Sequence, residues 1–272
     1  MNFIEKLTNA THKNNSLLCV GLDPDPKLMP KKVSIFEFNK AIIDATSDLV
    51  CAYKLNLAFY EALDDEGLDA LKRTIKYIPN DIPVIGDAKR GDIGNTAKAY
   101  AKAIFSNFNF DATTVNPYLG FDSIEPFIQY TNKGVFILCR TSNAGALDFQ
   151  SLRCEAEPNY RPLFELVALK ASQWNIYGNI GLVVGATYPE ELRLIRHSHP
   201  DMPLLIPGIG AQKGDLASAV RYGVNAQGEK AIISSSRQII YASREEDFAQ
   251  AARRVASSLR DQINSYRATL AL

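Results

Sequence analysis

The chain has 272 residues, of which 46% are hydrophobic and 22% are charged, and this balance excludes wholesale disorder. Its 30 lysines and arginines equal its 30 aspartates and glutamates, so no net field attracts nucleic acid or an anionic membrane. We therefore expect no nucleic-acid or membrane partner, and we expect any bound anion to be held by local groups.

The four cysteines predict reduced thiols rather than a disulfide framework. Cys19, Cys51 and Cys139 lie in apolar runs, Cys154 stands alone in a polar stretch, and no C-x-x-C pair occurs. The opening segment, MNFIEKLTNATHKNNS, lacks the apolar core of a signal peptide, and no apolar run approaches the roughly 20 residues needed to cross a bilayer. These features favour a cytoplasmic protein.

Eight short apolar runs predict buried strands. Each is rich in valine, isoleucine or leucine and ends in polar residues or glycine, without the polar alternation of a half-exposed strand. Such runs are typical of parallel strands that are buried on both faces. In chain order the runs begin at Ser16, Val50, Ile82, Ala112, Gly134, Ile180, Pro203 and Ala231.

Segments with helical periodicity lie between these runs. Strand alternating with helix predicts an α/β fold, a single (β/α)8 TIM barrel that forms one catalytic domain over 1–272. A doubly wound open sheet is the structural alternative, but it gives no reason for polar residues at so many strand ends. The long interruption at 143–161 predicts an enlarged loop on the functional face. The expected helices cover 36–48, 67–78, 95–108, 163–173, 189–197, 214–222 and 245–266.

Charged residues gather at the predicted carboxyl ends of the second and third strands. Lys54 and Asn56 alternate on the second strand, Asp87 and Lys89 alternate on the third, and Asp92 follows shortly after. Residues two apart on a strand face the same side, and charges in a barrel mouth are costly unless paired. A solvated turn is the simpler interpretation, but these strands are too apolar to be edges. We therefore predict a catalytic cluster.

Two loops predict a phosphate site. Barrels often bind phosphate after the seventh and eighth strands, where glycine turns expose backbone amides. Here the seventh run leads into PGIGAQ at 207–212, and the eighth leads into SSSR at 234–237. A G-x-G sequence alone is equally typical of a tight turn without ligand. Both loops together, with Arg237 to donate charged hydrogen bonds, favour a phosphate site.

The fifth strand ends in CRTSN at 139–143, whose hydroxyls and amides suit either the edge of a polar ring or an ordinary turn. The residues alone do not decide between these two interpretations.

The histidines do not predict a metal site. His197 and His199 lie near a predicted helix end, on the face opposite the chemistry, and two ligands fall short of the three or four that a metal needs. No dinucleotide fingerprint and no Walker A loop occurs in the sequence. We expect neither a metal nor a cofactor.

Together these motifs resemble the orotidine 5′-phosphate decarboxylase family. DAKRGDI at 87–93, with Lys54 on the strand before it, is highly specific, and AYKLNLAFYE, LCRTSNAG, PGIGAQ and SSSRQI resemble the longer, bacterial-type branch. The resemblance runs from Ser16 to the final helix and departs at Ala144, where many relatives carry proline. It implies cofactor-free decarboxylation of orotidine 5′-phosphate to uridine 5′-phosphate by a homodimer.

The resemblance also implies a role for each site residue. Lys89 would stabilise a carbanion at C6 of the pyrimidine and then protonate it, Asp87 would lie beside the leaving carboxylate, and Lys54 and Asp92 would complete the charge network. Asp92 and Thr96 would reach the site from the partner subunit. The expected substrate contacts are Asp23, Lys54 and Asn56 for the ribose, Thr141 and Ser142 for the pyrimidine, and Gln212, Ser236 and Arg237 for the phosphate.

Three other functions remain open on the sequence. A sugar-phosphate decarboxylase or aldolase on a related barrel uses a D-x-K-x-x-D motif with Mg²⁺, and activity in EDTA would exclude it. A Schiff base on Lys89 would be trapped by borohydride, but flanking carboxylates favour the charged ammonium over the free amine. A catalytically silent barrel should lack one of the network charges, and all four are present.

Overall fold

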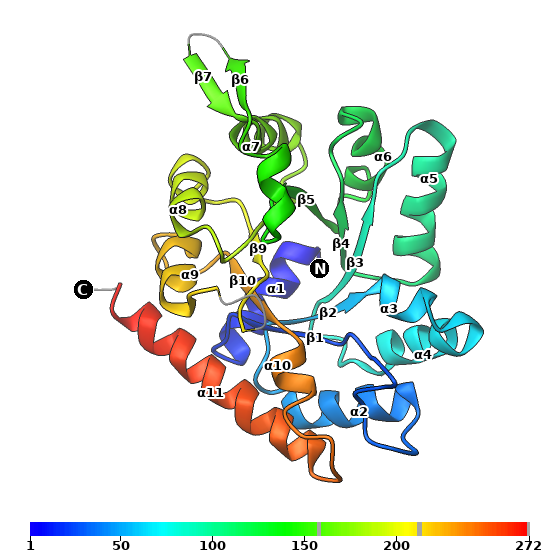
Figure 1. Ribbon diagram of the computed structural model, residues 1–272. Helices are drawn as coiled ribbons and strands as arrows, with labels where there is room; N and C mark the ends of the chain where they lie inside the picture. Colours follow the sequence, from blue (N-terminus) through cyan, green and yellow to red (C-terminus); the bar gives the residue numbers. More distant parts are fainter. Residues whose placement is uncertain (157–158, 211–213, 271–272) are drawn as a thin grey trace.

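The computed structural model describes residues 1–156, 159–210 and 214–270, and its centre is a closed barrel of eight parallel strands (Figure 1). The predicted (β/α)8 barrel is confirmed. Around the barrel the strand order is β1-β10-β9-β8-β5-β4-β3-β2, so the last strand closes on the first. The strands are β1 (Leu18–Gly21), β2 (Ala52–Asn56), β3 (Val84–Arg90), β4 (Ala112–Val115), β5 (Gly134–Arg140), β8 (Ile180–Val184), β9 (Leu204–Ile206) and β10 (Ala231–Ser235).

The predicted helices are all present, with ends that differ by a few residues. In α2, for example, Ser34 and Glu37 form a reciprocal capping box that fixes the first turn. The segment predicted over 95–108 is divided between α5 and a π-helical turn, η1 (Ala103–Asn107). The helices are α2 (Ile35–Thr46), α4 (Asp64–Tyr77), α5 (Gly94–Lys102), α7 (Leu163–Trp174), α8 (Pro189–Ser198), α9 (Leu216–Gly223) and α11 (Phe248–Ala268).

Several further elements were not predicted. The enlarged loop at 143–161 contains a 3-10 turn and an antiparallel hairpin, β6–β7, which projects from the body of the barrel (Figure 1). The other additions are short helices next to strand ends and one helix before the first strand. The helices are α1 (Phe3–Lys13), α3 (Leu57–Glu61), η2 (Phe121–Ser123), α6 (Glu125–Ile128) and α10 (Arg237–Ile240), and the elements of the enlarged loop are η3 (Ala144–Asp148), β6 (Arg153–Ala156) and β7 (Asn159–Pro162).

Helix α1 lies across the end of the barrel where the strands begin (Figure 1). Phe3 and Leu7, one turn apart, bury their side chains against the strands. The ring of Phe3 packs edge-on against the ring of Phe136, with 5.7 Å between the two ring centroids. Gly134 permits this approach, because a Cβ atom there would lie 2.4 Å from the Phe3 ring. The helix therefore closes the amino end of the barrel with apolar side chains.

The barrel interior is divided into an apolar and a charged part. On each of β2, β3 and β4, an apolar side chain is followed two residues later by a polar side chain on the same face of the strand. The polar side chains are Lys54, Asp87 and Thr114. We call the apolar part the lower layer; it comprises Cys19, Ala52, Ile85, Ala112, Phe136, Val183, Leu205 and Ile232.

A larger apolar cluster fills the space between the strands and the surrounding helices. Among the described residues, no helix is both long enough and apolar enough to cross a membrane.

Candidate active site

Three of the four predicted network charges meet at the carboxyl ends of β2 and β3. Asp87 accepts from both lysines: Lys54 Nζ lies 3.1 Å from Oδ2, and Lys89 Nζ lies 2.7 Å from Oδ1. Asp23 adds a second carboxylate, 3.9 Å from Lys54 Nζ. Parallel pairing explains this meeting, because the register places Gly21 beside Lys54 and Asn56 beside Asp87. The charges of this group therefore alternate in sign.

Burial and charge act in opposite directions on this group. Burial alone would lower the pKa of Lys54, which is only 6% exposed, but the carboxylates of Asp23 and Asp87 raise it above its ordinary value. Burial alone would raise the pKa of Asp87, but Lys54 and Lys89 hold it below its ordinary value. Both side chains are therefore ionised at neutral pH.

Lys89 differs from Lys54 in exposure and in backbone conformation. Its side chain is 47% exposed, so its ammonium can reach a ligand. Its φ angle is +47°, a left-handed value that is uncommon for a residue with a side chain. The pairing of β3 with β4 is irregular at this point, between Gly86 and Arg90. The contact of Lys89 with Asp87, predicted from regular alternation, thus depends on an irregular strand end.

Thr114 of β4 touches both of these residues. Its Oγ1 donates to Asp87 Oδ1 at 2.8 Å and accepts from the Lys89 backbone N–H at 3.0 Å. The side chain is buried at the level of Asp87.

Asp92 and Thr96 are not brought to the cluster of the same chain. Within the described residues Asp92 forms no ion pair, and its Oδ1 accepts from the backbone N–H of Ile93 at 2.8 Å. No ion pair therefore joins Asp92 to Lys89 within the part of one chain that the structure describes. The chain leaves the barrel at Gly91, which packs against Asn116, and Thr96 lies exposed on the first turn of α5.

A pocket of about 460 Å³ adjoins the cluster. The residues that line it include Asp23, Lys54 and Asn56 from the first two strand ends and Ser236 and Arg237 from the eighth. The structure thus brings together five of the residues predicted to bind substrate, while Gln212 lies outside the described residues. The pocket is large enough for a small polar ligand.

One wall of this pocket depends on a close approach of two strands. Gly21 faces Ser236, whose Cβ would lie 2.7 Å from a Cβ at position 21, and Ser236 Oγ donates to the Gly21 carbonyl at 3.1 Å. Tyr241 ties the following loop: its hydroxyl donates to the Asp23 carbonyl at 2.9 Å and accepts from the Asp25 N–H at 2.6 Å. Burial raises the pKa of Tyr241 to about 12, so the hydroxyl keeps its proton.

Thr141 and Ser142 lie at the end of β5 and are held by the enlarged loop. Gln150 accepts from the Thr141 N–H and donates to Thr141 Oγ1, both at 2.8 Å, which ties the two ends of the segment together. The Ser142 carbonyl accepts from Thr187 Oγ1 at 3.2 Å. Neither residue lines the pocket described above. Both residues follow the carboxyl end of β5, and their contact with a pyrimidine stays a prediction.

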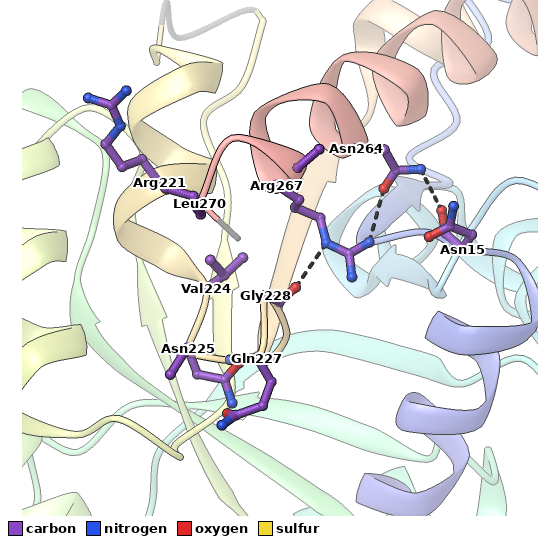
Figure 2. A pocket seen from close by; sticks show the side chains of 11 residues that line it. Asn15, Arg221, Val224, Asn225, Gln227, Gly228, Asn264, Arg267 and Leu270 are labelled. Atoms are coloured by element: carbon purple, nitrogen blue, oxygen red, sulfur yellow. Dashed lines mark hydrogen bonds between the residues drawn. The ribbon is translucent and has the colours of Figure 1, made fainter. Parts of the chain in front are cut away.

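A second pocket, of about 630 Å³, lies near the end of α11 and the loop before β10 (Figure 2). Two guanidinium groups line it, but Arg267 is engaged by the Gly228 carbonyl and by Asn264. Figure 2 shows the guanidinium of Arg221 pointing away from that of Arg267, so the two do not converge on one anion. This pocket contains no residue of the charged cluster.

The histidines agree with their predicted structural position. His197 lies in the last turn of α8, and the backbone N–H of His199 caps that helix. In the part of the chain that the structure describes, no group of three or more His, Cys, Asp or Glu side chains is arranged to hold a metal ion.

Comparison with known proteins decides the family. The profile of the "Orotidine 5′-phosphate decarboxylase / HUMPS family" matches residues 16–255. The chain belongs to this family. An orotidine 5′-phosphate decarboxylase of Dehalococcoides mccartyi is 58% identical over 267 residues, covering 98% of this chain and 99% of that protein. One from Ralstonia nicotianae is 52% identical over 276 residues, covering 98% and 100%.

A solved relative extends the likeness to the fold. The structure of the Leishmania donovani OMP decarboxylase has a TM-score of 0.85 and 40% sequence identity, and the match covers 98% of this chain and 99% of that one.

The sequence of this orotidine 5′-phosphate decarboxylase family member did not predict two residues that contact the site. Thr114 lies in the apolar run ATTV and carries no motif, although its place two residues after an interior alanine could have put it beside Asp87. Tyr241 follows the eighth strand by six residues, and nothing in its neighbourhood signals a contact with Asp23.

Proposed function

We propose that this protein converts orotidine 5′-phosphate into uridine 5′-phosphate and CO₂. The observation that carries the proposal is the ionised Asp87 between two ammonium groups, beside a pocket that contains Arg237. Relatives that are more than half identical over nearly the whole chain bear the name of this activity.

The reaction demands a fixed cation near C6 of the pyrimidine. When the bond between C6 and the carboxylate breaks, CO₂ departs and the electron pair stays on C6, where the ring cannot easily delocalise it. An ammonium held in place stabilises this charge far better than a mobile one in water. Lys89 is the exposed lysine of the cluster, and it would then transfer a proton to C6 and regain one from solvent.

The other charges prepare Lys89 for this role. Asp87 receives Lys89 on one carboxylate oxygen and Lys54 on the other, so it fixes the direction in which the Lys89 ammonium points. Asp87 would also lie beside the substrate carboxylate that leaves. Because Lys54 is buried and doubly compensated, it would serve to hold Asp87 ionised rather than to transfer protons.

Substrate binding would use the pocket and the loops around it. Ser236 and Arg237, with Gln212, would hold the phosphate, and Asp23, Lys54 and Asn56 would hold the ribose. Thr141 and Ser142 would meet the pyrimidine edge. Contacts to the remote phosphate supply binding energy that can be used to orient the ring at Lys89.

We further propose that the active unit is a homodimer whose partner subunit completes each site with Asp92 and Thr96. Among the described residues of its own chain Asp92 forms no ion pair, which leaves its carboxylate available to a partner subunit and supports this arrangement. The loops after β3 and β4 also expose large apolar side chains, with Ile93 at 54% and Tyr118 at 83% exposure. Exposed apolar residues of this size are typical of a surface that a partner covers.

We propose that the reaction needs no metal or cofactor and takes place in the cytoplasm. The free thiols of Cys19, Cys51, Cys139 and Cys154 suit a reducing compartment. One experiment tests the reaction and the metal requirement together: the loss of pyrimidine absorbance is followed when purified protein meets orotidine 5′-phosphate in EDTA. Formation of uridine 5′-phosphate is the expected result. Activity on keto-sugar phosphates that requires Mg²⁺, without any on the nucleotide, would contradict the proposal.

A further inference from the structure

We propose that Thr114 is a positioning residue for the decarboxylation, whose single hydroxyl fixes both the carboxylate of Asp87 and the backbone of Lys89. The inference rests on the proposed function, because it concerns the same cluster.

The direction of each hydrogen bond follows from chemistry. The Asp87 carboxylate is ionised between two lysines and can only accept, so the single hydroxyl proton of Thr114 must point at Asp87 Oδ1, 2.8 Å away. The lone pairs of the same oxygen then face the Lys89 N–H at 3.0 Å. One hydroxyl thus satisfies a buried acceptor and a backbone donor at once, and neither bond can be reversed.

The backbone of Lys89 needs such a restraint. Its φ of +47° is unfavourable for a residue with a Cβ, and such a conformation persists only where the surroundings hold it. The ladder between β3 and β4 is irregular there, so Thr114 supplies from its side chain a bond that regular pairing does not. If the backbone relaxed, the Lys89 ammonium would leave Asp87 Oδ1, where it now lies 2.7 Å away.

The neighbouring threonine shows what a purely structural hydroxyl does. Thr113 is also buried on β4, but its Oγ1 donates to the Gly86 carbonyl at 2.8 Å and touches none of the charges. Replacement of either threonine by valine removes a buried hydroxyl from the same strand while keeping the shape of the side chain. Only the change at position 114 disturbs Asp87 and Lys89, so Thr113→Val is a matched control.

The test compares kcat and KM for orotidine 5′-phosphate in Thr114→Val, Thr113→Val and Thr114→Ser. Loss of a hydrogen bond to a charged group predicts a kcat about 10- to 100-fold lower in Thr114→Val, with KM within about threefold of the wild type. Thr113→Val should retain kcat within about threefold, and Thr114→Ser should recover most of the loss because it keeps the hydroxyl. Calorimetric titration with uridine 5′-phosphate should give equal Kd values, since Thr114 does not line the substrate pocket.

Equal kcat values for Thr114→Val and Thr113→Val, in an otherwise active enzyme, would overturn the inference. So would a Thr114→Ser variant as slow as the valine variant. If Thr114→Val does not fold, Thr114→Ser and Thr114→Ala are compared instead, and equal kcat values for that pair would count against the hydroxyl. An inactive wild type would defeat the proposed function itself, which is a separate result.

Discussion

The two ends of the barrel interior differ in chemistry although the same strands build both. On β2 and β3 a step of two residues along one face leads from Ala52 to Lys54 and from Ile85 to Asp87. The lower layer, covered by α1, is buried and apolar, whereas the strand ends above it hold alternating charges. The apolar lower layer therefore affects the charged end, because charges interact more strongly next to a medium of low dielectric constant.

Lys89→Ala changes only the charged end of the barrel interior and should have the largest effect on catalysis. We expect kcat to fall by more than about a thousandfold, because the fixed cation beside C6 is lost. Stability should change by less than about 1 kcal/mol, since the side chain is half exposed and Lys54 still pairs with Asp87. Absorbance assays and thermal unfolding measure the two effects, with the exposed Lys76→Ala as control. Substantial remaining turnover would sink the proposed role of Lys89.

Phe3→Ala should lower stability and leave catalysis nearly unchanged, because it removes a side chain that packs on the lower layer and does not contact the charged cluster. Loss of a buried aromatic side chain predicts a free energy of unfolding lower by about 3 to 5 kcal/mol. The folded fraction should keep its KM and most of its kcat. Denaturant unfolding measures the change, and Ile176→Ala, which removes a 71% exposed side chain, should stay within about 0.5 kcal/mol. An unchanged stability would show that α1 does not seal the barrel.

Arg237→Ala changes the pocket beside the charged cluster and leaves the charges of the cluster in place. The expected result is a KM raised about 10- to 100-fold with a smaller loss in kcat, because a charge-assisted contact to the phosphate is removed. The surface variant Arg254→Ala should leave KM unchanged. Titrations with uridine and uridine 5′-phosphate measure the preference for phosphate. If Arg237→Ala discriminates the two as well as the wild type does, the phosphate assignment is wrong.

A mixing experiment asks whether a second subunit completes the charged end. In a random mixture of inactive Lys89→Ala and Asp92→Ala subunits, half of the dimers are mixed and each has one intact site, so activity should return to about a quarter of the wild-type value. Lys89→Ala mixed with Asp87→Ala should give no recovery, because both changes lie in the same half-site. Absence of recovery in the first mixture, after subunit exchange has been verified, would contradict a shared site.

Much of the fold could be predicted because the order of apolar and polar residues within each strand and helix is a local property of the sequence. Strands buried on both faces are visible in the sequence as apolar runs, and parallel strands end on the same face of the barrel, so Lys54, Asp87 and Lys89 could be placed together without a structure. The helices could be placed with similar success, since their periodicity is equally local.

The parts that escaped prediction depend on distant contacts. Gly91, which precedes Asp92, packs against Asn116 at the end of the next strand, and the sequence around the turn does not encode this contact. Thr114 has its role only because β4 lies next to β3, and a threonine in an apolar strand carries no signal of its own. Helix α1 buries Phe3, Leu7, Ala10 and Thr11, but only the first two are large apolar side chains, so the apolar periodicity of this segment is weak.

The closure of β1 on β10 has a consequence for the order of folding. Leu18 pairs with Ile233 and Val20 with Ser235, so this seam joins residues from opposite ends of the chain, and such distant pairing is slow to form. The pocket lies across the seam, with Asp23 and Lys54 on one side and Ser234 and Arg237 on the other. A nascent chain that ends before Ala231 would already contain Lys54 and Lys89 but would lack Ser234 and Arg237 of the pocket. A ligand that contacts both sides of the seam would bind only the closed barrel, and it would stabilise the closed barrel by mass action.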